Sequence, residues 1–514
     1  MMHHTTTMVV KKVIPFFTLL LVLSFTSVTA APFQSRTNTE EEDFQGDIKA
    51  FQQNMRAEMH TKMKNQQRLK MQDKMSGVPD SLLTLQSNEP VQMPSLDEAI
   101  VLALKAATKA ATDLIDTDFH KNGKKIVVPD NYKTIQEAIN IANSGDTIVV
   151  NPGIYYEQLV MKDGVKLVSD SSNHGDELVT IPDAHIKLPK RTLRTIIDGS
   201  KSKLSKHGMV DFDPGVGRKT IIDGFTIQNL PLQNHHIPGH AHGLNVRGAS
   251  PIIANCLIQN MGSTGIGSHV VYNDQDKRVP DRDFRWANVK HQASAVLYNN
   301  IIHSSVGLGI GCNHFSSPFI LGNEVYKNSD AVLGEAPTPG IGNKHGSFAT
   351  IIGNIVHDNP GGGIMAQKGA LQGRHGVDRP THPTISNNVV FDNGNKKPGI
   401  SCQNTGSLET PIIINGNHVY RASSVGIGLS RNSVGIIEDN MVMHSKYPNI
   451  TINGSIALKL NRNKVLGLGN APGITIVNRS VVNEMIGNAV ENGESQRFKV
   501  EKNSEVKEVE SRKK

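Results

Sequence analysis

Short apolar runs, each next to an asparagine, return along the chain from residue 255 to residue 488. YNNII, LGNEVY, IGNIV and SNNVV are examples. Runs this short, bounded by asparagine and glycine, are typical of brief β-strands joined by turns. Asn300 and Asn323 are 23 residues apart, as are Asn417 and Asn440. A period in the twenties without helical patterning predicts a solenoid of β-coils.

Other steps of the repeat are longer, and their extra residues must leave the solenoid as loops. The steps are 45 residues from Asn255 to Asn300, 31 from Asn323 to Asn354 and 34 from Asn354 to Asn388. We expect each asparagine at an inner turn, where its amide bonds the coils above and below. The asparagines therefore have a structural role, and function is expected in the loops.

Two helices are predicted before the repeats. Residues 95–114 are rich in alanine and leucine, and a capping box at Thr134 and Glu137 opens a short helix that ends near Ala142. Short strands follow this second helix, an arrangement that closes the exposed end of a β-solenoid.

A run from this capping helix onward resembles a known family. TIQEAINIANSGDTIVVNPGIYYEQLVMKDGVKLV, followed by TIIDG and TIIDGFTIQN, is similar to the first coils of right-handed parallel β-helix proteins of the pectate-lyase-like superfamily. The resemblance covers residues 124 to 490. It implies an all-β, right-handed parallel β-helix, preceded here by the N-terminal helical segment and the capping helix. It implies no single activity, because the same coils occur in lyases, hydrolases, epimerases, esterases and proteins without known chemistry.

The N-terminus has the pattern of an export signal. Lys11 and Lys12 precede an apolar stretch that ends near Leu23, and Val28-Thr29-Ala30 supplies a cleavage site. No cysteine follows for a lipid anchor, and no later stretch is apolar enough to cross a bilayer. We therefore expect a secreted or periplasmic protein. The predicted segments are a signal peptide (1–30), an N-terminal helical and linker segment (31–120), the β-helix (121–490) and a polar C-terminal tail (491–514).

The N-terminal segment also carries a methionine stripe. Met55, Met59 and Met63 lie four residues apart between residues 40 and 78. This spacing predicts an amphipathic helix that packs on the solenoid or on a protein or envelope partner. A soft metal site with His60 is the alternative.

Charge and composition narrow the class of partner. The net charge is +7, and only 20% of residues are charged. An excess of positive charge favours an acidic partner. With one tryptophan and no basic amphipathic helix, the chain does not suggest nucleic-acid binding.

The recurrent Gly-Ile pair sets the register in which candidate residues align. Counting four residues beyond Ile310, Ile341 and Ile364 places His314, His345 and Lys368 at equivalent positions of successive coils. Equivalent positions in a parallel solenoid stack about 5 Å apart. The three side chains, continued by Asn404 and Arg431, are therefore expected to line one basic column.

Long inserts bracket this column and supply further basic side chains. Arginine forks bind carboxylates, and the face of an indole stacks on sugar rings. An acidic polysaccharide is therefore the expected partner. The predicted substrate-binding residues are Arg282, Arg285, Trp286, His291, His375, Arg379 and Arg431.

The favoured reaction is β-elimination from a polyuronate. A base must remove the C5 proton while cations stabilise the developing charge on the carboxylate. His345 or Lys368 is the candidate base, and Arg374 or His314 the candidate stabiliser. Whether the protein is an enzyme stays open.

Other enzyme classes rank lower. No stacked aspartates indicate a Ca²⁺-dependent lyase, so calcium would need acids of the loops. Hydrolysis needs two nearby carboxyl groups, and only Glu335 and Asp378 are convenient, so a lyase ranks above a glycoside hydrolase or an epimerase. A non-catalytic surface scaffold or carbohydrate-binding protein is the main alternative function.

A histidine-rich loop offers another alternative. His235, His236, His240 and His242 lie within eight residues and are candidate Cu²⁺ or Zn²⁺ ligands. The sequence requires no cofactor, and a divalent metal is the one that this loop suggests. If metal is bound, the resemblance extends to exported copper-binding β-helix proteins of nitrous oxide reductase maturation, which implies a periplasmic copper- or zinc-binding accessory protein.

Overall fold

The computed structural model describes residues 91–116, 118–201, 207–232, 242–272, 286–329, 337–368, 379–469, 471–492 and 497–509. All of them belong to one compact unit, which begins at Leu83. The predicted signal peptide and the methionine stripe lie outside the described residues.

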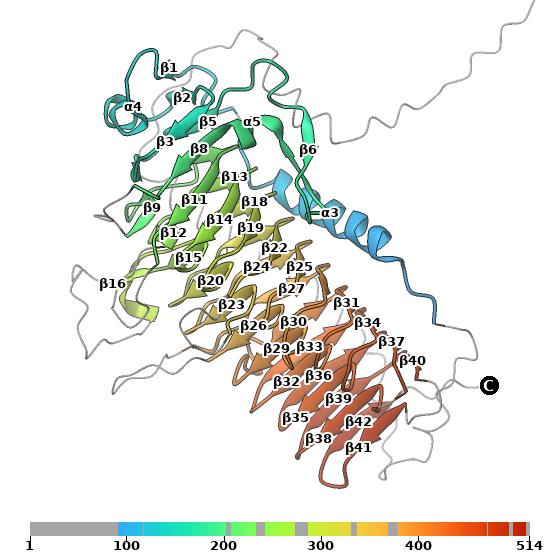
Figure 1. Cartoon of the computed structure of the whole chain (residues 1–514). Helices are drawn as coiled ribbons and strands as arrows, with labels where there is room; N and C mark the ends of the chain where they lie inside the picture. Colours follow the sequence, from blue (N-terminus) through green and yellow to red (C-terminus); the bar gives the residue numbers. More distant parts are fainter. Residues whose placement is uncertain are drawn as a thin grey trace, which may run out of the picture. The chain divides into compact units, whose positions relative to one another are not determined.

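Three parallel sheets, called sheets A, B and C, wind the chain into a β-helix (Figure 1). In most coils the chain adds one strand to sheet A, then one to sheet B, then one to sheet C. Each of these strands pairs in parallel with the equivalent strand of the next coil. The structure thus confirms the all-β parallel β-helix that the repeat predicts.

The strand bounds follow the order of the sheets. Sheet A contains β1 (Lys125–Val128), β2 (Thr147–Val150), β5 (Lys166–Ser169), β10 (Ile221–Asp223), β13 (Ile252–Ala254), β18 (Val296–Tyr298), β21 (Phe319–Leu321), β24 (Thr350–Ile352), β27 (Thr384–Ser386), β30 (Ile412–Asn415), β33 (Val434–Glu438), β36 (Ile456–Asn461), β39 (Val481–Met485) and β42 (Glu505–Val509). Sheet B contains β3 (Gly153–Tyr155), β8 (Thr195–Asp198), β11 (Thr226–Leu230), β14 (Leu257–Met261), β19 (Ile301–His303), β22 (Glu324–Tyr326), β25 (Ile355–His357), β28 (Val389–Phe391), β31 (His418–Tyr420), β34 (Met441–Met443), β37 (Lys464–Leu466) and β40 (Ala489–Glu491). Sheet C contains β4 (Leu159–Met161), β9 (Gly208–Phe212), β12 (His242–Arg247), β15 (Ile266–His269), β20 (Ile310–Asn313), β23 (Ile341–Lys344), β26 (Ile364–Gln367), β29 (Ile400–Gln403), β32 (Ile427–Ser430), β35 (Ile450–Asn453), β38 (Ile474–Val477) and β41 (Phe498–Val500).

Two short antiparallel strand pairs and a short helix lie outside the three main sheets. An antiparallel pair, β6 (Leu178–Thr180) and β7 (Lys187–Pro189), leads into the short helix α5 (Lys190–Arg194). A second antiparallel pair, β16 (Val271–Tyr272) and β17 (Val289–His291), flanks the first long insert. These two pairs belong to inserts that leave the regular coils.

The Gly-Ile register predicted from the sequence is confirmed. The isoleucine of each pair faces its equivalent in the next coil along sheet C, as Ile310, Ile341 and Ile364 do. All three are at most 1% exposed. Since strand residues alternate between the two faces, the residue after each isoleucine points outward and the next one points inward again. This stacked column forms one wall of the core.

The asparagine ladder is also confirmed, with one correction. The side-chain amide of Asn323 donates to Leu297 O at 2.8 Å and to Asn354 Oδ1 at 3.0 Å, and later ladder asparagines repeat the pattern. Asn255, however, is not in the ladder. The N–H of Cys256 donates to Asn300 Oδ1 at 2.9 Å, so Cys256 occupies the ladder position. Asn255 is the preceding turn residue, with a left-handed φ of 55°.

Both predicted helices form. Helix α4 (Ile135–Ile141) has the capping box of Thr134 and Glu137, and it packs beside β1, β2 and β4 at the start of the solenoid. Helix α3 (Leu96–Thr112) starts at Ser95 with a second capping box. These capping boxes satisfy main-chain N–H groups that the first turn of a helix leaves unpaired.

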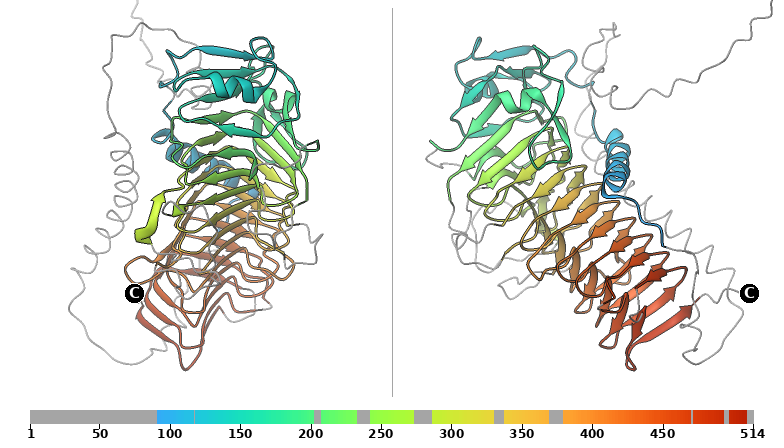
Figure 2. Two further views of the ribbon diagram at one scale, coloured as in Figure 1. Left: turned by 90° about the vertical axis from the view of Figure 1, so that its left-hand side faces the viewer. Right: turned by 45° about the vertical axis from the view of Figure 1, so that its right-hand side comes forward.

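Helix α3 packs on the β-helix itself, against β21, β24 and β28 (Figures 1 and 2). Its alanines Ala99, Ala103 and Ala107 are at most 2% exposed. Helix α3 thus lies inside the predicted N-terminal segment 31–120 and packs its apolar face on the β-helix. Residues 31–90 of that segment lie outside the described residues, and the docking of the segment on a partner stays a prediction.

The predicted boundary at residue 490 needs a second correction. Strands β41 and β42 pair in register with β38 and β39, so the β-helix continues to Val509. Phe498, Val500 and Val506 continue the inward rows of the preceding coil, and the residues between them are mostly polar. Its composition is that of a terminal coil rather than of a free tail.

Candidate functional site

A row of polar side chains runs along the outer face of sheet C, one residue per coil. Lys344 pairs with Gln367, Gln367 with Gln403, and Gln403 with Ser430. All four are half-buried. We call the whole set the sheet C polar row; it consists of Arg247, His269, Asn313, Lys344, Gln367, Gln403, Ser430 and Asn453.

The turn column lies one residue beyond this row, where the chain leaves sheet C. It contains the predicted His314, His345 and Lys368, followed by Asn404 and Arg431. The rings of His314 and His345 have centroids 5.0 Å apart. The N–H of His345 donates to Lys368 O at 3.1 Å, which stacks these two coils. The structure therefore brings the three predicted residues onto neighbouring coils of one edge.

The side chains of the turn column point outward because the backbone at most of these residues is left-handed. His314, His345, Asn404 and Arg431 have φ between 52° and 56°, in the left-handed region. That conformation costs about 1–2 kcal/mol per residue for a side chain other than glycine. It turns the chain from sheet C toward sheet A within one residue and leaves the side chain at the surface. Arg431 and Lys368 are exposed, and His314 and His345 are half-buried.

His345 has the most strongly perturbed environment of the column. Burial, together with the charge of Lys344, lowers the pKa of His345 to about 4. Burial also lowers the pKa of Lys344. The Nδ1 atom of His345 is buried and has no hydrogen-bond partner within the described residues. At neutral pH the ring is therefore uncharged and carries a free ring nitrogen.

The single tryptophan lies in an aromatic cluster next to this column. Trp286 makes edge contacts with Phe315, at 5.7 Å between centroids, and with Phe348, at 5.5 Å. The guanidinium carbon of Arg379 lies 4.5 Å above the indole ring. Phe348 in turn stacks on His382 with centroids 5.3 Å apart. The two predicted binding residues Trp286 and Arg379 thus meet each other, and Arg379 occupies one face of the indole.

The other predicted residues are more scattered. His291 lies at the end of β17, beside Gly248. His242, in β12, lies over Gly267 of β15, and its ring centroid is 6.5 Å from that of His269. The remaining predicted residues lie outside the described part of the chain: Arg282, Arg285, Arg374, His375, His235, His236 and His240.

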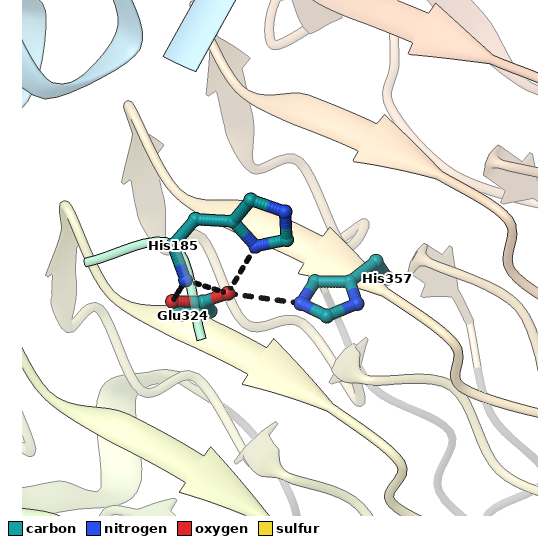
Figure 3. Close-up of side chains that lie close together, drawn as sticks. All are labelled: His185, Glu324 and His357. Atoms are coloured by element: carbon teal, nitrogen blue, oxygen red, sulfur yellow. Dashed lines mark hydrogen bonds and ion pairs between the residues drawn. The ribbon is translucent and has the colours of Figure 1, made fainter. Parts of the chain in front are cut away.

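A second cluster, which the sequence did not reveal, lies on the outer face of sheet B. His185, Glu324 and His357 point toward one another from the β6–β7 connection, β22 and β25 (Figure 3). Glu324 Oε1 lies 2.7 Å from His185 Nδ1 and 2.9 Å from His357 Nε2. The side chain of Glu324 is fully buried, whereas that of His185 is 31% exposed.

Hydrogen bonds determine the protonation state of the Glu324 carboxyl group. Burial raises its pKa, but hydrogen bonds from His185, His357 and the main chain outweigh burial, and the net shift is downward. The pKa of His185 is raised, mainly by its hydrogen bond to Glu324. Glu324 is therefore an ionised carboxylate inside an apolar surface.

One signal in the sequence points to this cluster. Along the row of sheet B that contains Glu324, the preceding residue is Ile301 and the following ones are Ile355 and Val389. A single acid in an otherwise apolar row needs a partner when it is buried. The partner His185 lies 139 residues earlier, in an insert, so spacing alone does not identify it.

Comparisons with known proteins place the chain in a family. The model of the family described as "Protein of unknown function (DUF1565)" matches residues 122–378, which is half of the 514 residues. The model described as "Right handed beta helix region" matches residues 339–510. This second match agrees with the predicted handedness. None of the curated proteins matches the chain.

Several solved structures are similar to the chain at low sequence identity. One is the A-module of the mannuronan C-5 epimerase AlgE6 from Azotobacter vinelandii, with 12% identity and a TM-score of 0.37 over 73% of this chain and 93% of that chain. Another is the Dettilon tailspike protein, with 14% identity and a TM-score of 0.41 over 73% of this chain and 68% of that chain. A double mutant of the periplasmic alginate epimerase AlgG has 13% identity and a TM-score of 0.40 over 85% of this chain and 99% of that chain. At these values the likenesses carry no argument about activity.

Among the helices in the described part of the chain, none combines the length and the hydropathy needed to cross a bilayer.

Proposed function

Because this chain belongs to the DUF1565 family, whose description names no activity, we propose a function from its own surface: it binds an acidic polysaccharide along sheet C and cleaves it by β-elimination. The observation that carries the proposal is His345, a neutral and half-buried histidine 5.0 Å from His314 in the turn column. The proposal includes export through residues 1–30, which lie outside the described residues.

The sheet C polar row suits an extended polymer. Successive strands of a sheet are about 4.8 Å apart, so the row presents a hydrogen-bonding side chain at each such step. Lys344 and Lys368 add positive charge at two neighbouring coils, and cations at this spacing attract the carboxylates of a polyuronate. The row therefore offers repeated polar contacts to a repeating anionic ligand.

The chemistry assigned to His345 follows from its neutral state. The uncharged ring accepts the C5 proton of a uronate, the electron pair forms a C4–C5 double bond, and the C4–O bond breaks. The departing oxygen takes a proton from water. A pKa of about 4 makes the free ring a weak base, but a bound carboxylate beside the ring raises that pKa. Lys368 and His314 stabilise the negative charge that develops on the carboxylate.

The test is turnover of a panel of polyuronates by the mature protein, read as ultraviolet absorbance of the unsaturated product. We expect His345→Gln to reduce the rate at least about 100-fold with an unchanged melting temperature. His444→Gln, a histidine in the turn between sheets B and C, is the matched control and should retain activity. Absence of product across the panel rejects the lyase.

A carbohydrate-binding protein without catalysis is the second candidate, and the continuation of the turn column to Asn404 and Arg431 favours it. These residues extend the surface beyond the two histidines without adding a base. Emission from Trp286, the only tryptophan, reports ligand binding beside the column. Saturable quenching by a polyuronate without product formation supports this second function.

A further inference from the structure

We propose that His185, Glu324 and His357 form a binding site for a divalent transition metal such as Zn²⁺, on the outer face of sheet B and not on the sheet C face of the proposed polysaccharide site. The three candidate ligand atoms lie within 4.8 Å of one another. Two imidazole nitrogens and one carboxylate oxygen are the donor set that Zn²⁺ accepts in protein sites with one open position. The inference does not depend on the proposed lyase.

Glu324 is already oriented as a ligand. Its Oε2 atom accepts the main-chain N–H groups of His185 at 2.8 Å and of Ile186 at 2.9 Å. These bonds hold one oxygen of the carboxylate against the β6–β7 connection. The other oxygen, Oε1, faces both imidazole rings and also accepts the main-chain N–H of His185 at 2.9 Å.

His357 is held in the matching orientation by a second carboxylate. Its Nδ1 donates to Asp358 Oδ2 at 2.8 Å, which directs Nε2 toward Glu324. A carboxylate on the far nitrogen of a histidine is the usual outer partner of a metal ligand, because it fixes the ring and increases its basicity. The aromatic rings of Tyr326 and Phe391 stack on the two faces of His357 and further limit its motion.

The distances fit a metal after small shifts. Zn–N and Zn–O bonds of about 2.0–2.2 Å place the ligand atoms of a tetrahedral site roughly 3.3 Å apart. Glu324 Oε1 is 2.7 Å and 2.9 Å from the two ring nitrogens, so both separations must lengthen by about half an ångström. His185 can move by this amount because its side chain is 31% exposed, whereas His357 stays in place and the carboxylate must adjust to it. The same exposure leaves the fourth position of the metal open to water.

Charge balance supports a cation in this cluster. The carboxylate of Glu324 is fully buried, and a bound cation would balance its charge. The side chain of Asp358 is 48% exposed, so water screens its charge. Protonation of a ring would balance Glu324 as well, and the experiment must exclude this alternative. A bound ion would join the β6–β7 connection to sheet B, because its ligands come from both.

The experiment is Zn²⁺ binding by the untagged full chain after removal of metal with a chelator, measured by calorimetry and by elemental analysis after dialysis. We expect one strongly bound Zn²⁺ per chain at this site. Glu324→Gln and His185→Ala should each weaken it at least about 100-fold, and Asp358→Asn about 10- to 100-fold. His185→Ala keeps the proposal testable if Glu324→Gln fails to fold, since His185 lies on an exposed connection.

Two controls separate this site from other histidines. His303→Gln changes a ring in the same row of sheet B as His357 and should leave Zn²⁺ binding unchanged. Replacing His240 and His242 tests the histidine-rich loop. The proposal is overturned if the metal-free chain takes up no Zn²⁺ at micromolar concentration. It is equally overturned if His185→Ala binds as wild type, or if the strongly bound ion disappears only with the loop histidines.

Discussion

The outer faces of sheets B and C belong to the same coils but differ in what covers them. On sheet B, His357, Phe391 and Tyr420 follow one another along a row, and each is at most 5% exposed. On sheet C, the equivalent row contains Gln367 and Gln403, which are half-buried. One repeat thus supports an outer face packed like a core and another that remains polar.

The covering of sheet B comes from the chain itself. Ala99 and Ala103 of α3, and Ile186 and Leu188 of the β6–β7 segment, belong to one buried apolar cluster with residues of sheet B. Two segments distant in sequence therefore share one face of the solenoid. The difference shows that the aromatic and aliphatic rows of sheet B are buried within the protein, whereas the row of sheet C, with its amides and Lys344, stays partly accessible to solvent.

The largest expected effect comes from breaking the covered side with Gly353→Val. Gly353 has a φ of +67°, and an added Cβ would lie 2.2 Å from the carbonyl oxygen of Ala103 in α3. Valine is strained at this φ and also pushes the helix away. We expect a loss of at least about 3–5 kcal/mol in unfolding free energy, or release of α3. Denaturant melting and limited proteolysis near residue 113 measure the two outcomes, and wild-type behaviour in both would show that α3 is not docked.

Much of the regular fold was predictable because it depends on local and periodic signals. The Gly-Ile pairs fixed the register of sheet C, and the capping box at Thr134 marked the helix at the start of the solenoid. The predicted ladder position in the first coil was wrong by one residue. Asn255 lies in a left-handed turn, a conformation that also favours asparagine. The last two strands were missed because only a few apolar residues, such as Phe498 and Val506, continue the inward rows of the solenoid there, and charged residues surround them.

The candidate sites were predictable only where they follow the repeat. The turn column of His314, His345 and Lys368 followed from counting residues. The contact of His185 with Glu324 did not, because an insert brings the two together across 139 residues. The docking of α3 could not be predicted either, because an alanine-rich helix face can pack on many apolar surfaces. Inserts and helices are positioned by tertiary contacts, and the periodicity of the sequence does not predict such contacts.

A smaller loss of stability is expected at acidic pH. One histidine on each face, His303 and His345, contributes to it. Burial and the charge of Lys327 lower the pKa of His303, on sheet B, to about 4. Burial and the charge of Lys344 lower that of His345, on sheet C, to about 4. Since both values are below the ordinary 6.5, the unfolded chain binds more protons between about pH 6.5 and pH 4. Stability is complete above this window and falls as the pH drops through it, by at most about 1.4 kcal/mol per pH unit and per group.

Single substitutions separate the two contributions. His303→Phe keeps a ring beside Tyr326, and His345→Gln keeps a polar side chain in the turn column. Each should flatten part of the dependence of melting temperature on pH. A saturating polyuronate should weaken the contribution of His345 and leave that of His303 unchanged, because only sheet C is proposed to bind it. Equal responses of the two histidines would contradict the distinction between the faces.

The smallest effect is expected from Gly428→Ala on the outer face of sheet C. An added Cβ at this glycine would meet only Val425 Cγ1, at 3.7 Å, which is an ordinary contact. Alanine also restricts the unfolded chain, so stability should change by less than about 1 kcal/mol, with a slight gain favoured. Denaturant melting beside Gly353→Val gives the direct comparison of the two glycines. A loss as large as that of Gly353→Val would mean that sheet C is covered as tightly as sheet B, and a polysaccharide would then have no access to the polar row at this coil.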